Sequence, residues 1–253
     1  MKNILLKVEY DGTVYKGWQT QNLKSAGNSP AKVATIQQTI EKSLSVIFQK
    51  KISIAGSGRT DSGVHAKEQV ANFKINNEIP LRRLKKSLNS LLPNDIIIKQ
   101  IKYVDLDFHA RFSAKSKLYR YTILNRDYGS AFLRNQVFHF AMPLDLKLMR
   151  AEAVLLKGKH DFRSFQASEK KPRSSVRTIQ KISIKTQEDL IFIDIQADGF
   201  LYNMVRNIVG TLIEIGRGKM PKGTMRKLLD IKDRTYAGPT APALGLCLIK
   251  VFY

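Results

Sequence analysis

The chain is poor in cysteine and in long hydrophobic runs. Cys247 is the single cysteine among 253 residues, so no intramolecular disulfide can form. Its apolar neighbours are typical of a small buried residue in a late strand rather than of a nucleophile. No apolar run reaches the roughly 18 residues of a membrane span, and the chain start does not have a signal-peptide pattern. We therefore expect a soluble cytoplasmic protein with no membrane association.

Histidine is also scarce, and its distribution argues against a metal centre. The chain has four histidines and no cysteine cluster that could complete a ligand set with them. Their positions show no metal-ligand spacing: His65, His109, His139 and His160. We therefore predict no metal site.

Acidic residues are few beside a large excess of basic ones. Lys plus Arg total 43 and Asp plus Glu total 21, which leaves a net charge of +22. Such a surplus repels itself in the folded state and becomes useful when a polyanion binds and releases counterions. Nucleic acid is the first candidate, and an anionic membrane the second, although no strongly amphipathic basic helix supports it. The basic residues cluster at Arg82-Arg83, at Lys85-Lys86, and within residues 159–163, 170–173 and 219–227.

Hydrophobic periodicity in the first part of the chain predicts alternating strands and helices. Strands are expected at residues 2–10, 51–56, 69–75 and 95–104, with helices at 35–49 and 80–91. Residues 20–32 have the composition of a long exposed loop. This order is β-α-β-β-α-β, the ferredoxin-like pattern.

The second part of the chain repeats the order without repeating the sequence. Strands are expected at residues 117–124, 176–185, 190–197 and 246–252, and helices at 144–156, 201–215 and 224–230. We therefore predict an α+β fold of two ferredoxin-like halves with a cleft between them. The predicted domains are residues 1–108 and 109–253.

A glycine-rich polar segment, residues 56–66, joins two predicted strands and is too long for a simple hairpin turn. Its three glycines permit unusual backbone angles and close approach to a ligand. Asp61 follows Arg59 and Thr60, so a hydrogen-bonded carboxylate near a cation is expected there. The alternative is an ordinary turn in which Asp61 caps the backbone.

Two further segments carry polar or aromatic residues at informative spacing. Residues 115–121 open a strand that places Tyr119 and Tyr121 on one face, which suits stacking on unpaired nucleotides. The alternative is that both tyrosines are sheet core, which we favour for Tyr121. The helix after Gly199 has Arg206 and Asn207 on one stripe, which indicates either a functional or packed face or a solvated one.

Taken together, these segments resemble the bacterial tRNA pseudouridine synthase A family. The resemblance runs nearly from end to end, and residues 58–66 are similar to the active-site signature Gly-Arg-Thr-Asp-x-Gly-Val-His-Ala. Further matches lie at residues 10–12, 17–19, 117–121, 161–165, 199–210 and 240–246. In two places the chain departs from the family pattern: residues 21–35 are longer than expected, and Ser62 stands where alanine is commoner.

The resemblance implies an activity and a set of roles. It implies a homodimer with the pseudouridine synthase fold that needs no metal and no cofactor and isomerises uridines in the anticodon stem-loop of tRNA. Asp61 is then the catalytic carboxylate, acting as a nucleophile or as a base, and Arg206 is its ion-pair partner. Tyr119 stacks on the target base and is a candidate for moving the final proton. The residues expected to bind substrate beside it are Arg59, Thr60 and His65.

Three other functions remain open from the residues. The first is a non-catalytic RNA-binding protein, which would explain the charge equally well. The second is an Asp-dependent phosphoryl-transfer enzyme, although that chemistry gathers several carboxylates around Mg²⁺ and Asp61 has no acidic neighbour within its loop. The third is the same isomerisation on a different RNA.

Overall fold

The computed structural model describes residues 1–20, 34–167 and 174–253 and divides the chain into two compact units. The first unit comprises Met1–Lys115 together with Leu248–Tyr253, and the second comprises Ser116–Cys247. The division lies after Lys115 rather than after residue 108, and the C-terminal residues return to the first unit. Most of the predicted loop 20–32 and the basic cluster 170–173 lie outside the described residues.

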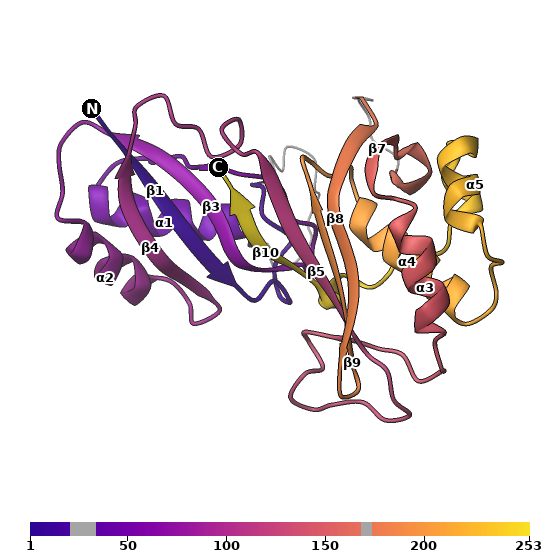
Figure 1. Ribbon diagram of the computed structural model, residues 1–253. Coiled ribbons are helices and arrows are strands. Elements are labelled where there is room, and N and C mark those ends of the chain that lie inside the picture. The colour runs from indigo at the N-terminus through magenta and orange to yellow at the C-terminus, as the bar shows by residue number, and fades with distance from the viewer. Residues whose placement is uncertain (21–33, 168–173) are drawn as a thin grey trace, which may run out of the picture. The chain divides into compact units, whose positions relative to one another are not determined.

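The first unit has the predicted β-α-β-β-α-β order (Figure 1). It consists of β1 (Lys2–Tyr10), α1 (Ile36–Phe48), β2 (Ala55–Gly56), β3 (His65–Ile75), α2 (Leu81–Leu91) and β4 (Ile96–Val104). The sheet order is β4-β1-β3, with β1 antiparallel to both neighbours, and β10 (Leu246–Phe252) lies beside β3. The central strand β1 is therefore bonded on both edges, which makes it a rigid support.

The helix α1 begins where the sequence indicated. Thr35 is the N-cap, and its side chain accepts a hydrogen bond from the Gln38 N–H. Ile36, Ile40 and Leu44 recur at helical spacing and are fully buried. The amphipathic pattern of this helix therefore packs it into the core of the first unit.

The predicted strand 51–56 is much shorter in the structure, where only Ala55–Gly56 pair with β3. Ile52 and Ile54 are buried between exposed neighbours, which is the alternation that suggested a strand. However, the Ile54 N–H donates to Glu41 Oε1 at 2.9 Å, and Gln37 Nε2 donates to the Ile54 carbonyl at 3.2 Å. Because side chains of α1 satisfy these backbone groups, the segment is extended without being part of a ladder.

The second unit has the predicted order with two short additions, but most of the predicted closing strand 246–252 belongs to the first unit. Its strands are β5 (Ser116–Leu124), β6 (Phe138–His139), β7 (Gly158–Asp161), β8 (Val176–Gln187) and β9 (Leu190–Ala197). Its helices are α3 (Leu146–Val154), α4 (Met204–Gly216) and α5 (Thr224–Ile231). The sheet order is β5-β9-β8-β7, and the short strands β6 and β7 were not predicted. The hairpin breaks between Gln187 and Leu190, as expected.

The helices α3 and α4 lie side by side in this unit (Figure 1). The helix α4 begins at Met204 rather than at residue 201, because Asn203 adopts the left-handed conformation at φ 58°. Glu152 on α3 is 2% exposed, and its carboxylate accepts hydrogen bonds from the Gly223 and Met225 N–H groups at the start of α5. This buried carboxylate therefore caps a helix that has no side-chain cap of its own.

We predict that Glu152→Ala lowers the free energy of unfolding by roughly 2 kcal/mol, because the buried Met225 N–H and the more exposed Gly223 N–H both lose their acceptor. The measurement is the urea unfolding midpoint. The matched control is Asp230→Ala, which removes an exposed carboxylate of α5 paired with Arg226 and should change stability by less than about 0.5 kcal/mol. Equal effects of the two substitutions would contradict the capping role.

Candidate active site

The loop at residues 57–64 joins β2 to β3 in the first unit and is anchored at its base by a buried amide. Gln69 is fully buried, accepts a hydrogen bond from Ser57 Oγ at 2.6 Å and donates one to the Gly58 carbonyl at 3.1 Å. The Ser57 N–H also donates to the Val70 carbonyl at 2.7 Å. The start of the loop is therefore fixed to the middle of β3.

A backbone turn shapes the part of the loop that contains Asp61. The Val64 N–H donates to the Asp61 carbonyl at 3.2 Å, and Gly63 has a φ of 78°. That positive φ at the third position is the conformation of a type II turn, which favours glycine. The turn is made by backbone groups, and Asp61 itself is partly exposed.

Thr60 attaches the loop to the segment that follows β1. Its hydroxyl lies 2.8 Å from the Tyr10 hydroxyl, and its carbonyl accepts a hydrogen bond from the Trp18 N–H at 3.1 Å. Gly17 comes so close that a Cβ atom there would be 2.4 Å from the Thr60 carbonyl oxygen. The residue before Asp61 is thus held by a side chain and by the backbone.

His65 makes a second attachment to the same segment. It is 7% exposed, and its Nδ1 accepts a hydrogen bond from the Gly12 N–H at 3.0 Å. The same nitrogen lies 3.1 Å from Asp11 Oδ1. Burial raises the pKa of Asp11, but hydrogen bonds from Thr13 and the proximity of His65 outweigh it and hold the pKa below its usual value.

Arg59 differs from these two residues because its side chain is exposed. The Arg59 Nε donates to Gln19 Oε1 at 3.3 Å, a contact between the loop and the end of the first described segment. An exposed guanidinium is suited to bind phosphate or nucleotide oxygen atoms.

In the second unit, β5 holds both predicted tyrosines in the sheet. Tyr121 is fully buried and donates its hydroxyl to the Pro242 carbonyl at 2.8 Å, which confirms it as core. Tyr119 is 7% exposed and packs edge-on against Phe200, with ring centroids 5.1 Å apart. The ring of Tyr119 is therefore fixed in direction by an aromatic neighbour.

Arg206 lies in the first turn of α4 and is oriented by two acceptors. Its Nε donates to the Ala241 carbonyl at 2.7 Å, and its Nη1 donates to Asn203 Oδ1 at 3.0 Å. The Ala241 N–H donates in return to the Arg206 carbonyl at 3.1 Å. The guanidinium is thus fastened to the segment that precedes β10.

The stripe of α4 that contains Arg206 is packed, so the alternative of a solvated face is wrong. Asn207 is fully buried and donates to the Phe165 carbonyl at 2.8 Å. Its Oδ1 accepts from the Thr240 hydroxyl at 2.6 Å and from Arg234 at 3.1 Å. The sequence did not indicate an individual role for Asn207 or Ala241, although both lie in segments that match the family pattern.

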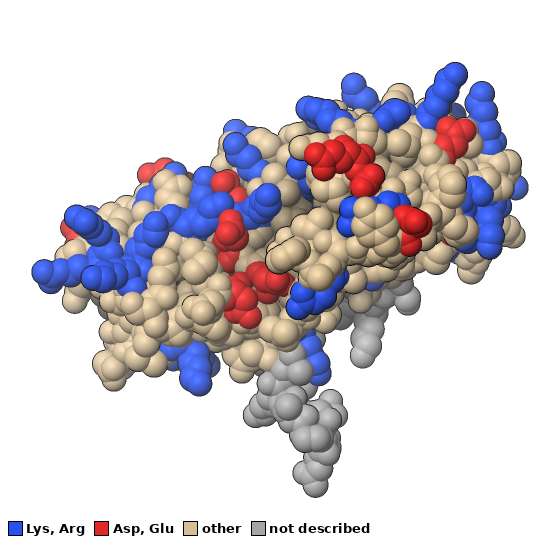
Figure 2. Space-filling view, turned by 90° about the horizontal axis from the view of Figure 1, so that it is seen from below, with Lys and Arg blue, Asp and Glu red and all other residues tan. Residues whose placement is uncertain are grey.

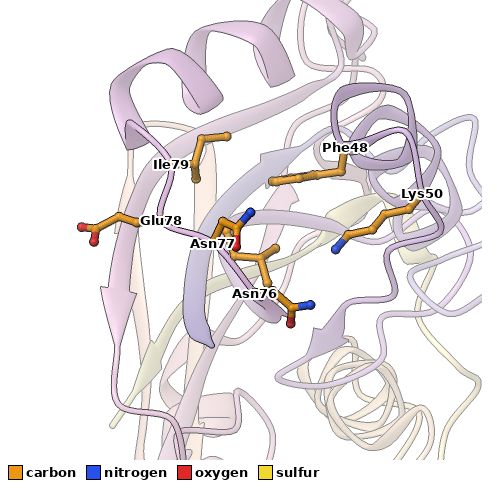
Figure 3. A pocket seen from close by; sticks show the side chains of 7 residues that line it. Phe48, Lys50, Asn76, Asn77, Glu78 and Ile79 are labelled. Atoms are coloured by element: carbon orange, nitrogen blue, oxygen red, sulfur yellow. The ribbon is translucent and has the colours of Figure 1, made fainter.

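The surface also has a pocket that lies apart from the predicted site residues. A pocket of about 370 Å³ in the first unit contains none of the predicted site residues (Figure 3). Its lining combines apolar and amide side chains with one residue of each charge: Phe48, Lys50, Ile75, Asn76, Asn77, Glu78 and Ile79. Within the described part of the chain, no three His, Cys, Asp or Glu side chains are grouped to hold a metal ion.

Among the charged side chains on the face shown in Figure 2, Lys and Arg cover more of the surface than Asp and Glu. Among the described residues, no helix is both long and apolar enough to cross a bilayer. Asp61 and its loop belong to the first unit, whereas Tyr119 and Arg206 belong to the second. The expected meeting of these groups stays a prediction.

Comparison with known proteins agrees with this organisation. The profile of the tRNA pseudouridine synthase family matches residues 7–113 and 153–253. The chain is 46% identical to the tRNA pseudouridine synthase A of Thermoanaerobacter sp. (strain X514) over 253 residues, which is all of both chains. It is 48% identical to tRNA pseudouridine synthase A 2 of Clostridium perfringens (strain 13 / Type A) over the same full length. Because the profile covers most of the chain and these relatives are similar over their full length, the chain belongs to the tRNA pseudouridine synthase family.

Proposed function

We propose that this protein isomerises uridine to pseudouridine in tRNA and that its targets lie in the anticodon stem-loop. Family membership supports an isomerase that acts on tRNA. The net charge of +22 supports a polyanionic substrate. The observation that carries the proposal is the loop that presents Asp61 from a backbone fastened at Thr60, Val64 and His65.

The reaction needs little beyond a well-placed carboxylate. The glycosidic bond from the sugar to N1 of uracil breaks, and a new bond forms from the same sugar carbon to C5. The C5 hydrogen leaves as a proton and N1 gains one, so there is no net oxidation or hydrolysis. Asp61 starts this sequence either by adding to the sugar or by removing a sugar proton, and both routes require an ionised carboxylate.

Arg206 is proposed to keep Asp61 ionised. Burial under a bound RNA disfavours a carboxylate, and a cation close by opposes that effect. The bonds from Arg206 to the Ala241 carbonyl and to Asn203 support this role, because they hold the guanidinium in one orientation. A preoriented cation stabilises a charged partner without reorganisation at the moment of reaction.

Substrate contacts are assigned around the same carboxylate. Tyr119 is proposed to stack on the extruded uracil and to assist the final proton transfer. Arg59, whose side chain is exposed, is proposed to hold the target nucleotide out of its stack, which costs a few kcal/mol. Thr60 and His65 are buried. We propose that they contribute to substrate binding indirectly, by holding the loop in its conformation.

We predict that Asp61→Asn lowers pseudouridine formation by roughly a thousandfold or more while tRNA binding persists, because the amide neither attacks nor accepts the proton. The assay is tritium release from tRNA labelled at C5 of uridine. The control, Asp107→Asn, removes an exposed carboxylate from the same unit and should leave the rate unchanged.

Full activity in Asp61→Asn would sink the enzymatic proposal and favour a non-catalytic RNA-binding protein. A crystal structure with tRNA bound checks the pairing directly: the Asp61 carboxylate and the Arg206 guanidinium should lie within roughly 6 Å of each other. A larger separation would remove Arg206 from the proposal and leave Asp61 in it.

We predict that Tyr119→Phe retains tRNA affinity and loses turnover, because the ring still stacks while the hydroxyl is gone. Binding is measured by filter retention and turnover by the same tritium assay. Tyr121→Phe, which removes the buried hydroxyl bonded to Pro242, serves as the control for stability alone. Wild-type turnover in Tyr119→Phe would eliminate the proton-transfer role.

The homodimer and the cytoplasmic location implied by the family resemblance are part of the proposal. Sedimentation equilibrium of the purified protein should give a mass of about twice 28.7 kDa. A mass that stays at the single-chain value across the concentrations used in activity assays would show that one chain acts alone.

A further inference from the structure

A buried pair of hydroxyl groups links the end of β1 to the residue before Asp61. The Tyr10 and Thr60 oxygens lie 2.8 Å apart, and the two residues are 2% and 6% exposed. A hydrogen bond in such a low-dielectric position is stronger than in water, and either hydroxyl left unpaired there is costly. We propose that Tyr10 is a positioning residue, whose hydroxyl sets the direction of the Asp61 carboxylate through Thr60. The inference rests on the proposed catalytic role of Asp61.

Tyr10 lies on a strand that is hydrogen-bonded on both edges. It is the last residue of β1 and pairs with Ala66 on β3 and with Ile96 on β4. The pairing with β3 shifts by one residue between Val8 and Tyr10, which is a β-bulge. Bulges re-aim side chains, and here the tyrosine beside the bulge keeps its backbone in the ladder while its side chain reaches Thr60 of the catalytic loop.

The other support of Thr60 leads to α1. Trp18 donates its N–H to the Thr60 carbonyl. The carbonyl of Trp18 in turn accepts a hydrogen bond from the Gln37 N–H at 3.0 Å. The Gly17 carbonyl likewise accepts from the Ile36 N–H at 3.1 Å. The first turn of α1 therefore holds residues 17 and 18, and these hold the backbone of Thr60 while Tyr10 holds its side chain.

The rings of Tyr10 and Trp18 join the two supports. Their centroids lie 6.1 Å apart, and both side chains are almost fully buried. A rotation of Thr60 would thus break a hydroxyl pair on one side and a backbone bond on the other. The loop is fixed before any RNA binds, and such preorganisation acts on the chemical step more than on affinity for the substrate.

The test compares variants that remove or keep one hydroxyl. Tyr10→Phe and Thr60→Val each delete one partner with little change of shape, and each should lower kcat about tenfold while KM for tRNA stays within about twofold. The double variant should be no slower than either single variant, because the same bond is lost. Thr60→Ser restores the hydroxyl that Thr60→Val lacks, so its kcat should be several times higher than that of Thr60→Val.

Tyr103→Phe is the matched control in the same unit. The Tyr103 hydroxyl bonds both the N–H and the carbonyl of Ile79, so its loss weakens the fold without touching the loop. Its kcat per folded molecule should equal that of the wild type, with folding measured by circular dichroism under assay conditions.

A wild-type kcat in Tyr10→Phe would overturn the positioning role. The same conclusion would follow if the kcat per folded molecule of Tyr10→Phe equalled that of Tyr103→Phe. The failure of the proposed function is distinguishable from this result. If the proposed function fails, Asp61→Asn keeps its activity. If only the positioning role fails, Asp61→Asn is inactive and Tyr10→Phe is fully active.

Discussion

The attachment of Thr60 to Tyr10 and Trp18 is the constraint on which the candidate active site depends. A polar loop with three glycines has many accessible conformations, and ordering it costs conformational entropy. Here that cost is met during folding by bonds to β1 and to the segment held by α1. The carboxylate of Asp61 therefore projects from a backbone with little freedom, which is what catalysis by a single acid requires.

In the second unit, Arg206 is likewise held by hydrogen bonds to neighbouring polar groups. Asn207 is fully buried and binds Thr240, Arg234 and the Phe165 carbonyl, and the adjacent Ala241 carbonyl fixes the guanidinium. In both units a charged group proposed to act on the substrate is directed by neutral polar groups beneath it. Neutral amides and hydroxyls can be buried at much lower cost than charges, provided that they are hydrogen-bonded. They can therefore orient a partly exposed charged residue at low cost.

The basic surface has a different physical basis from the loop. Lys and Arg exceed Asp and Glu by 22, and on the face in Figure 2 basic side chains cover more of the surface than acidic ones. Such a surplus contributes affinity for any RNA and steers association, but it carries no information about which uridine is modified. In the proposed function, selectivity for the reaction depends instead on a few individual groups, Asp61 and Arg59 in the first unit and Tyr119 and Arg206 in the second.

The sequence by itself determined the order of the longer strands and helices, the Thr35 cap and the loop that contains Asp61, because periodicity, capping and glycine content are local properties. The short strands β6 and β7 escaped it. It did not reveal that residues 51–54 bond to α1 side chains, or that the chain end joins the first unit. Nor did it reveal the contact between Tyr10 and Thr60, which are 50 positions apart. Only the tertiary structure decided these features, because each depends on a bulge, a register or a buried polar partner brought together by packing of distant segments.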